Sequence, residues 1–179
     1  MKTFSSFTKT CELKKFYRNP LVMSALKLSS LVLIFVSALV VLISLASDYW
    51  ISSSVSFFGL WRLCVQGICT SLGSAADVDA TRAFIIISFL LLVASGVLQI
   101  LEIWISTVMA GVNKQKLVTI MNFCAACSAI IAMGVFTGSA NSAGAGVPFS
   151  WSYALGWVSV GLSLLAGVVA LVSFKKEAQ

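Results

Sequence analysis

The chain has 179 residues, of which 59% are hydrophobic and only 10% are charged, and its formal net charge is +6. A soluble domain carries about 25% charged residues, so this chain lacks the side chains for a water-facing surface and we expect a lipid bilayer around it. Histidine is absent, which removes the commonest general base and metal ligand. We therefore expect that the protein is not an enzyme and that it has no catalytic residues, metal, cofactor or nucleic-acid partner.

Four apolar runs are each long enough to cross about 30 Å of hydrocarbon as a helix. They show no strand-like alternation, so a membrane barrel is disfavoured. The first run is too long for a cleaved signal peptide and is followed by Asp48-Tyr49-Trp50 rather than small residues, so we expect a retained anchor. The expected organisation is a basic extension at 1–27, a four-span domain at 28–176 (helices 28–46, 83–104, 117–137 and 151–174; connecting segments 47–81 and 138–150) and a tail at 177–179.

Lysine and arginine are distributed very unevenly between the two ends of these helices. Six lie before the first apolar run, two between the second and third, and two after the fourth, whereas Arg62 and Arg82 lie elsewhere. Because cytosolic loops carry the excess of basic residues, we expect both termini in the cytosol and segments 47–81 and 138–150 outside. The basic extension is either attracted to anionic lipids or a solvated topogenic flank.

Small residues recur at helical spacing in the expected helices. Ser159, Ser163 and Gly167 form such a stripe in the fourth helix, and Gly134 and Gly138 lie four apart in the third. Small residues let helices approach closely in lipid. We interpret these stripes as packing within the bundle; an oligomer interface is the alternative.

The segment 47–81 predicts a small hairpin with a disulfide. Val55 and Phe57 alternate with serines as in a strand. A two-residue turn at Gln66-Gly67 places Cys64 opposite Cys69 as a non-hydrogen-bonded pair, about 4.5 Å apart at Cα and within disulfide range. On an oxidising side of the membrane a Cys64–Cys69 bridge follows, the alternative being two free thiols.

The apolar stretch Gly59-Leu60-Trp61 has two interpretations. Either it anchors the segment at the membrane surface, or it inserts into the outer mouth of the helix bundle and seats the small domain there.

The pattern Trp50…Gly59-Leu60-Trp61…Cys64…Cys69 resembles the signature of the claudin superfamily, and residues 24–176 follow its order of four helices. Arg82 matches the arginine at the start of the family's second helix. The start of the fourth helix resembles the lens-fibre branch, which we group with the epithelial and peripheral myelin membrane proteins, and also a natural-killer granule membrane protein. The residues that carry this second resemblance are Phe149, Trp151, Tyr153, Gly156 and Trp157.

The resemblance implies an all-α membrane protein, namely a four-helix transmembrane bundle capped by a small extracellular antiparallel β-sheet. It implies that Arg82 ties the sheet to the bundle and that segment 138–150 adds an edge strand. The implied function is a plasma-membrane structural or adhesion protein at cell–cell contacts, a homo-oligomer in cis and in trans, with other membrane proteins as further partners. The alternative is a regulator of vesicle or granule traffic, or an auxiliary subunit, in an internal membrane.

A paracellular channel ranks last among these functions. Such a pore is lined by charged side chains, and segment 47–81 carries only Asp48, Arg62, Asp77 and Asp79.

Three further residues lie within the apolar runs or at their ends. Cys124 and Cys127 form a C-x-x-C pattern, but a redox pair needs accessible thiolates, so we interpret them as small apolar packers. Glu102 is interpreted as an interfacial residue, with an ion pathway as the alternative.

Overall fold

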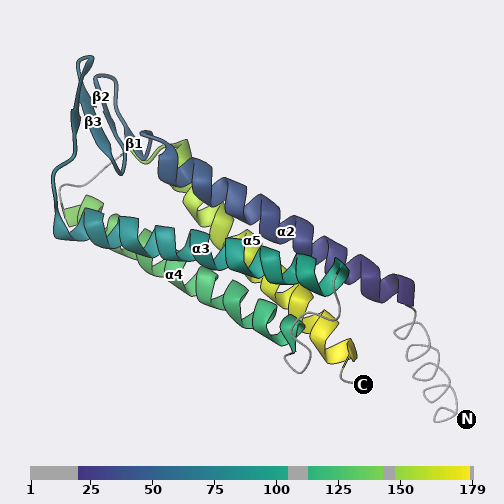
Figure 1. Ribbon diagram of the computed structural model, residues 1–179. Helices are drawn as coiled ribbons and strands as arrows, with labels where there is room; N and C mark the ends of the chain where they lie inside the picture. The colour runs from purple at the N-terminus through teal and green to yellow at the C-terminus, as the bar shows by residue number, and fades with distance from the viewer. Residues whose placement is uncertain (1–19, 105–112, 143–147, 178–179) are drawn as a thin grey trace, which may run out of the picture.

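The computed structural model describes residues 20–104, 113–142 and 148–177. Within them lie four long helices: α2 (Pro20–Ala46), α3 (Ala76–Trp104), α4 (Lys114–Ser142) and α5 (Trp151–Glu177). All four are long and apolar enough to cross a membrane. Figure 1 shows them side by side as an elongated bundle, with a small sheet at one end and the start of α2 and the end of α5 at the other.

The helices are longer than the expected membrane spans. α2 begins at Pro20 instead of residue 28, α3 at Ala76 instead of 83, and α4 runs from Lys114 to Ser142 instead of 117–137. The apolar runs mark only the most apolar part of each helix, whereas 29 helical residues extend about 44 Å and so exceed the hydrocarbon thickness. Asp77 and Asp79 lie in the first turn of α3, where acidic groups interact favourably with the helix dipole.

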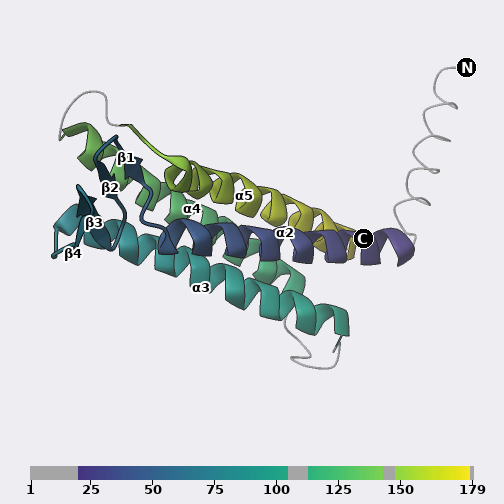
Figure 2. The same cartoon turned by 90° about the horizontal axis from the view of Figure 1, so that it is seen from above.

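Each helix packs against two neighbours, in the order α2–α3–α4–α5 and back to α2 (Figure 2). Buried serine hydroxyls donate across these contacts to backbone carbonyls: Ser37 to Ser159 at 3.2 Å, Ser44 to Ser152 at 2.8 Å, and Ser88 to Ala125 at 2.9 Å. Such bonds contribute about 0.6 kcal/mol each in a membrane bundle. These three serines therefore fill narrow helix contacts without leaving their hydroxyls unsatisfied.

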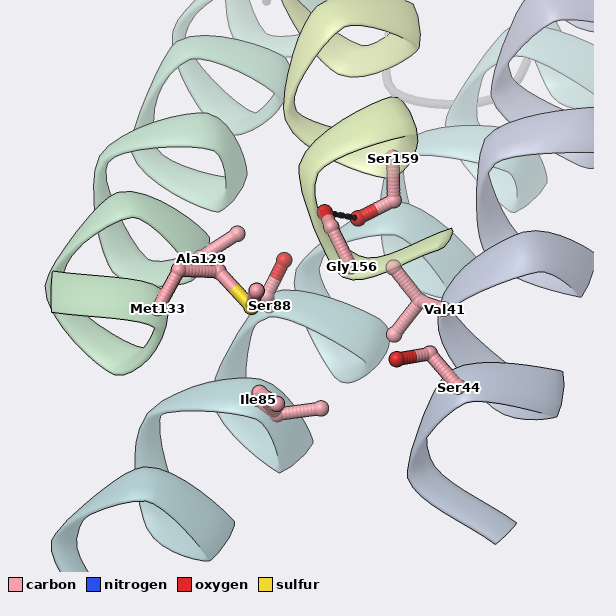
Figure 3. A pocket seen from close by; sticks show the side chains of 8 residues that line it. All are labelled: Val41, Ser44, Ile85, Ser88, Ala129, Met133, Gly156 and Ser159. Atoms are coloured by element: carbon pink, nitrogen blue, oxygen red, sulfur yellow. Dashed lines mark hydrogen bonds between the residues drawn. The ribbon is translucent and has the colours of Figure 1, made fainter. Parts of the chain in front are cut away.

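One small cavity lies where all four helices meet (Figure 3). Its walls include the Ser44, Ser88 and Ser159 side chains, and its volume is about 10 Å³. That volume corresponds to about one water molecule. This level of the bundle is therefore packed core and too narrow to conduct ions.

The sheet is a four-stranded antiparallel meander. Its strands β1 (Ile51–Ser52), β2 (Ser56–Phe58), β3 (Arg62–Val65) and β4 (Ile68–Ser71) lie in the order β1-β2-β3-β4. The β3–β4 turn has positive φ at Gln66 (50°) and Gly67 (83°), as a two-residue type I′ turn requires. The predicted register and disulfide are confirmed: Cys64 lies opposite Cys69, their Cα atoms are 4.0 Å apart, and the two are bonded.

Residues 148–150 contact the β1 edge without forming a strand. The backbone nitrogen of Ser52 donates to the Pro148 carbonyl at 3.1 Å, and Ile51 forms an isolated bridge with Phe149. In place of the expected edge strand the described residues show this single bridge, because α5 begins at Trp151.

Candidate contact site at the sheet cap

The sheet rests on the bundle through two fully buried side chains. Trp50 and Leu60 are both 0% exposed. The Trp50 indole nitrogen donates to the Ser44 carbonyl at 2.8 Å, and its ring packs edge-on against Phe136 at 4.6 Å between centroids. Leu60 belongs to the same apolar cluster. These two residues anchor the sheet in the mouth of the bundle.

Gly59 allows the closest backbone approach at this junction. A Cβ built on Gly59 would overlap the Cα of Asp48 and lie 3.0 Å from the Asp48 carbonyl carbon. Gly59, the residue after β2, therefore lies directly against the backbone that follows α2. This close contact keeps the next residue, Leu60, buried between the sheet and the bundle.

Trp61 and Arg82 join the sheet to α2 and α3. Trp61 is 42% exposed, yet its indole nitrogen donates to the Leu45 carbonyl at 2.9 Å. The Arg82 guanidinium lies 4.9 Å from the centre of this ring, donates to the Leu60 carbonyl at 2.7 Å and pairs with Asp79 at 2.6 Å. Asp79, rather than the nearby Asp48 or Asp77, is therefore the carboxylate that pairs with Arg82.

The start of α5 packs beneath β1. Phe149 stacks on Tyr153 at 4.2 Å, and the Tyr153 hydroxyl shares a 2.8 Å hydrogen bond with Thr137. Trp151 stacks on Tyr49 at 6.0 Å.

The next turn of α5 separates a buried glycine from an exposed tryptophan. A Cβ on Gly156 would lie 2.5 Å from Met133 Sδ, so the absence of a side chain on this glycine leaves room for Met133 of α4. Trp157 is half-exposed and faces away from the bundle.

The small-residue stripes face different ways. Ser159 and Ser163 are buried, and a Cβ on Gly167 would lie 3.3 Å from the Phe123 ring, so this stripe packs inside the bundle. Gly134 and Gly138, in contrast, are exposed, and a Cβ on either would meet nothing within 4 Å. The interpretation of these two glycines as intramolecular packing is wrong, because they lie on the outer face of α4.

Cys124 and Cys127 lie on this outer face too. Both thiols are free and exposed, so they face outward from the helix rather than into the core of the bundle. No group of three or more histidine, cysteine or acidic side chains that could hold a metal is found among residues 20–104, 113–142 and 148–177.

Glu102 lies in an ion cluster at the opposite end of the bundle. It contacts Lys27 at 3.1 Å and Lys114 at 3.7 Å, and its side chain is 20% exposed. The cluster joins α2, α3 and the start of α4, so Glu102 has a structural partner on each neighbouring helix. The amino-acid pattern alone did not predict this cluster, although all three residues lie toward the ends of their helices that are away from the sheet.

Sequence comparisons agree with this architecture. Human Lens fiber membrane intrinsic protein is 28% identical over 150 residues, which cover 79% of this chain and 87% of the relative. Mouse Protein NKG7 is 33% identical over 138 residues (73% and 80%), and mouse Claudin domain-containing protein 2 is 26% identical over 138 residues (76% and 80%). The family model of the PMP-22/EMP/MP20/Claudin family matches residues 23–170. The protein is therefore a membrane-embedded member of the PMP-22/EMP/MP20/Claudin family.

Proposed function

We propose that this protein is a multi-pass plasma-membrane protein that organises cell–cell contacts, with the sheet outside and both termini in the cytosol. Basic residues support this orientation. Lys27 lies in the first third of α2, and Lys114 and Lys116 lie at the start of α4; both helices begin at the end of the bundle away from the sheet (Figure 1), and the basic side of a membrane protein is usually cytosolic. The Cys64–Cys69 bridge supports it too, since disulfides persist on the oxidising side.

The observation that carries the proposal is the open edge of the sheet. β1 is covered by residues 148–150, whereas β4 is the last strand and pairs within the sheet only with β3. All four residues of β4 are exposed, and Ile68 is 73% exposed. An exposed edge strand with an apolar side chain is a surface on which another strand can pair. We infer that β4 is where the sheet meets a second copy on the opposing cell.

The adhesion half of the proposal is tested by a charge on this edge. Lysine on an edge strand opposes strand pairing, so Ile68→Lys is expected to reduce aggregation of adhesion-poor cells that express the protein. Ser54→Lys adds the same charge at the exposed β1–β2 connection and is the matched control. Equal aggregation by both variants, at equal surface expression, would contradict an adhesive β4 edge.

The outer face of α4 supports lateral association between copies in one membrane. Gly134 and Gly138 form a small-xxx-small pattern with open space above both residues, and such a surface lets two helices approach closely. Cys127 lies seven residues before Gly134, on the same exposed face. Two copies packed on this face bring their Cys127 thiols near each other.

This lateral contact is tested by oxidative cross-linking of Cys127 in a background that carries Cys11→Ser and Cys124→Ser, which leaves Cys127 as the free thiol. Gly138→Ile is expected to abolish the cross-linked dimer while the fold persists, because the new side chain points away from the bundle. Gly161→Ile is the control, since Gly161 also meets open space but lies on α5. Equal cross-linking in both variants would exclude the Gly134–Gly138 face.

A second candidate is a regulator of vesicle or granule traffic or an auxiliary subunit of another membrane protein. The resemblance of the Phe149–Trp157 stretch to a granule membrane protein favours it. Steady-state location separates the two candidates: contact membranes support adhesion, and internal vesicles support traffic.

A further inference from the structure

A cavity of about 310 Å³ lies between the sheet and the ends of α3 and α4. Ile51, Phe58 and Leu63 form its sheet wall, because the strand register places all three in one row on one face. Val78 and Phe136 close it from the helices. The volume is at the lower end of the range of about 300–1,000 Å³ for ligand pockets.

The cavity is an apolar chamber with a single charged group. Asp77 is the one charged residue in its lining. Within the described part of the chain this carboxylate has no ion pair, whereas Asp79 is paired with Arg82. Arg62 precedes Leu63 in β3 and so lies on the opposite face of the sheet. Asp77 is exposed to the surroundings at the rim of the cavity, so the cationic head of a bound molecule can reach it without competing with a protein cation.

The position of the cavity indicates how such a molecule reaches it. Asp77 lies in the first turn of α3 and Phe136 in the last two turns of α4, and both helices are long enough to cross the bilayer. Their ends beside the sheet (Figure 1) fall outside the roughly 30 Å that the hydrocarbon requires, and we place them near headgroup depth, where the polar head of a membrane-dissolved amphiphile is also found. An alkyl chain can enter the apolar chamber from the bilayer while its head stays at the level of Asp77.

We propose that this cavity binds the apolar chain of a membrane-soluble amphiphile whose ammonium head pairs with Asp77. Ser56 and Ser139 also line the cavity and supply hydroxyl oxygens that accept hydrogen bonds from the head group. A neutral alcohol of the same length keeps the apolar contacts and loses the ion pair, and a carboxylate meets repulsion. The site is independent of adhesion, because it requires neither the β4 edge nor a second copy.

The test uses the full chain in phosphatidylcholine nanodiscs and three dodecyl probes that differ only in the head: amine, alcohol and carboxylate. Each carries a photoreactive diazirine near the end of the chain, and mass spectrometry locates the adducts. We expect the amine to label the peptides that contain Phe58, Leu63 or Phe136 about fivefold more than the alcohol, the factor for a partly exposed ion pair. The carboxylate should label them least.

Two pairs of variants separate charge from shape. Asp77→Asn should remove the preference for the amine, whereas Asp48→Asn, an acidic residue at the same end that does not line the cavity, should keep it. Ser139→Phe should reduce labelling by amine and alcohol together, whereas Ser142→Phe, one turn further along α4, should not. The Cys64–Cys69 disulfide verifies that each variant is folded.

Three results would overturn the proposal. Adducts spread evenly over the lipid-facing helix surfaces would mean that no alkyl chain occupies the cavity. Equal labelling of the cavity by all three probes, or a preference for the amine that survives Asp77→Asn, would mean that Asp77 does not select a cation.

Discussion

The junction between sheet and bundle makes a sharp prediction for Gly59→Ala. The new Cβ would overlap the Asp48 Cα and approach the Asp48 carbonyl carbon to 3.0 Å. These are backbone atoms, which have no rotamer to move into. Overpacking a well-packed site costs about 1–3 kcal/mol, and we take the upper value because the obstacle is backbone.

An opposing effect reduces this cost. Among the described residues, Gly67 is the glycine with positive φ, so Gly59 has a conformation that alanine also adopts. Replacing such a glycine by alanine stabilises a protein by about 0.4–1 kcal/mol, because it lowers the conformational entropy of the unfolded chain. The net expectation for Gly59→Ala is a loss of about 2 kcal/mol, a decrease in melting temperature of roughly 5 °C for a chain of this size.

The measurement is thermal unfolding in detergent micelles, monitored by tryptophan fluorescence, which reports on Trp50 and Trp61 beside the altered residue. Gly73→Ala is the matched control, because a Cβ there meets nothing within 4 Å and the variant should melt at or slightly above the wild-type temperature. If Gly59→Ala and Gly73→Ala melt together, the close contact with Asp48 does not hold the sheet on the bundle.

Three further variants address the disulfide, the ion cluster and the tryptophan at the junction. Cys64→Ser opens the disulfide loop, whose cysteines have a sequence separation of 5, and should lower the unfolding free energy by about 2 kcal/mol. Cys124→Ser removes a lipid-facing thiol and should leave unfolding unchanged. Equal melting curves for the two variants would exclude a stabilising bridge. Glu102→Gln removes the carboxylate that Lys27 and Lys114 both contact and should cost about 1–2 kcal/mol of unfolding free energy. The measurement is unfolding at low and high salt, and a variant as stable as wild type under both conditions would contradict this expectation. Trp61→Ala loses the hydrogen bond to the Leu45 carbonyl and the ring under Arg82, which together contribute about 1–2 kcal/mol, and the variant should be retained in the endoplasmic reticulum. The lipid-facing control Trp157→Ala should reach the cell surface normally. Normal surface expression of Trp61→Ala would contradict the prediction.

The hairpin could be predicted from sequence because its geometry is local. Once Gln66 and Gly67 occupy a two-residue turn, counting along both strands determines which residues face each other, and the Cys64–Cys69 pair follows without knowledge of the rest of the fold. The four helices could be predicted for a similar reason, since the length of an apolar run reflects the thickness of the bilayer.

The facing of the small-residue stripes could not be predicted from spacing. Residues four apart share one helix face, but the spacing is the same for an inner and an outer face. Gly167 lies against a ring of α4 and Gly138 faces outward, and only the arrangement of all four helices distinguishes them.

Long-range polar partners were likewise beyond the sequence. Arg82 had three nearby carboxylates, and the choice of Asp79 depends on where the Leu60 carbonyl lies. Glu102 meets Lys27 because α2 packs beside α3, a neighbour relation that no local pattern encodes. The cavity beside Asp77 depends in the same way on the distance between the sheet and the helix ends.

The central claim, that this protein organises contacts between cells through its sheet, is tested most directly in a mixed culture of adhesion-poor cells. Half of the cells express the protein with a fluorescent tag on one of its two termini, both of which we place in the cytosol, and the tag is imaged at cell borders. The account predicts enrichment at borders between two expressing cells and none at borders with non-expressing cells. A tag confined to internal vesicles, in protein that has formed its disulfide and left the endoplasmic reticulum, would contradict the account and favour a role in traffic.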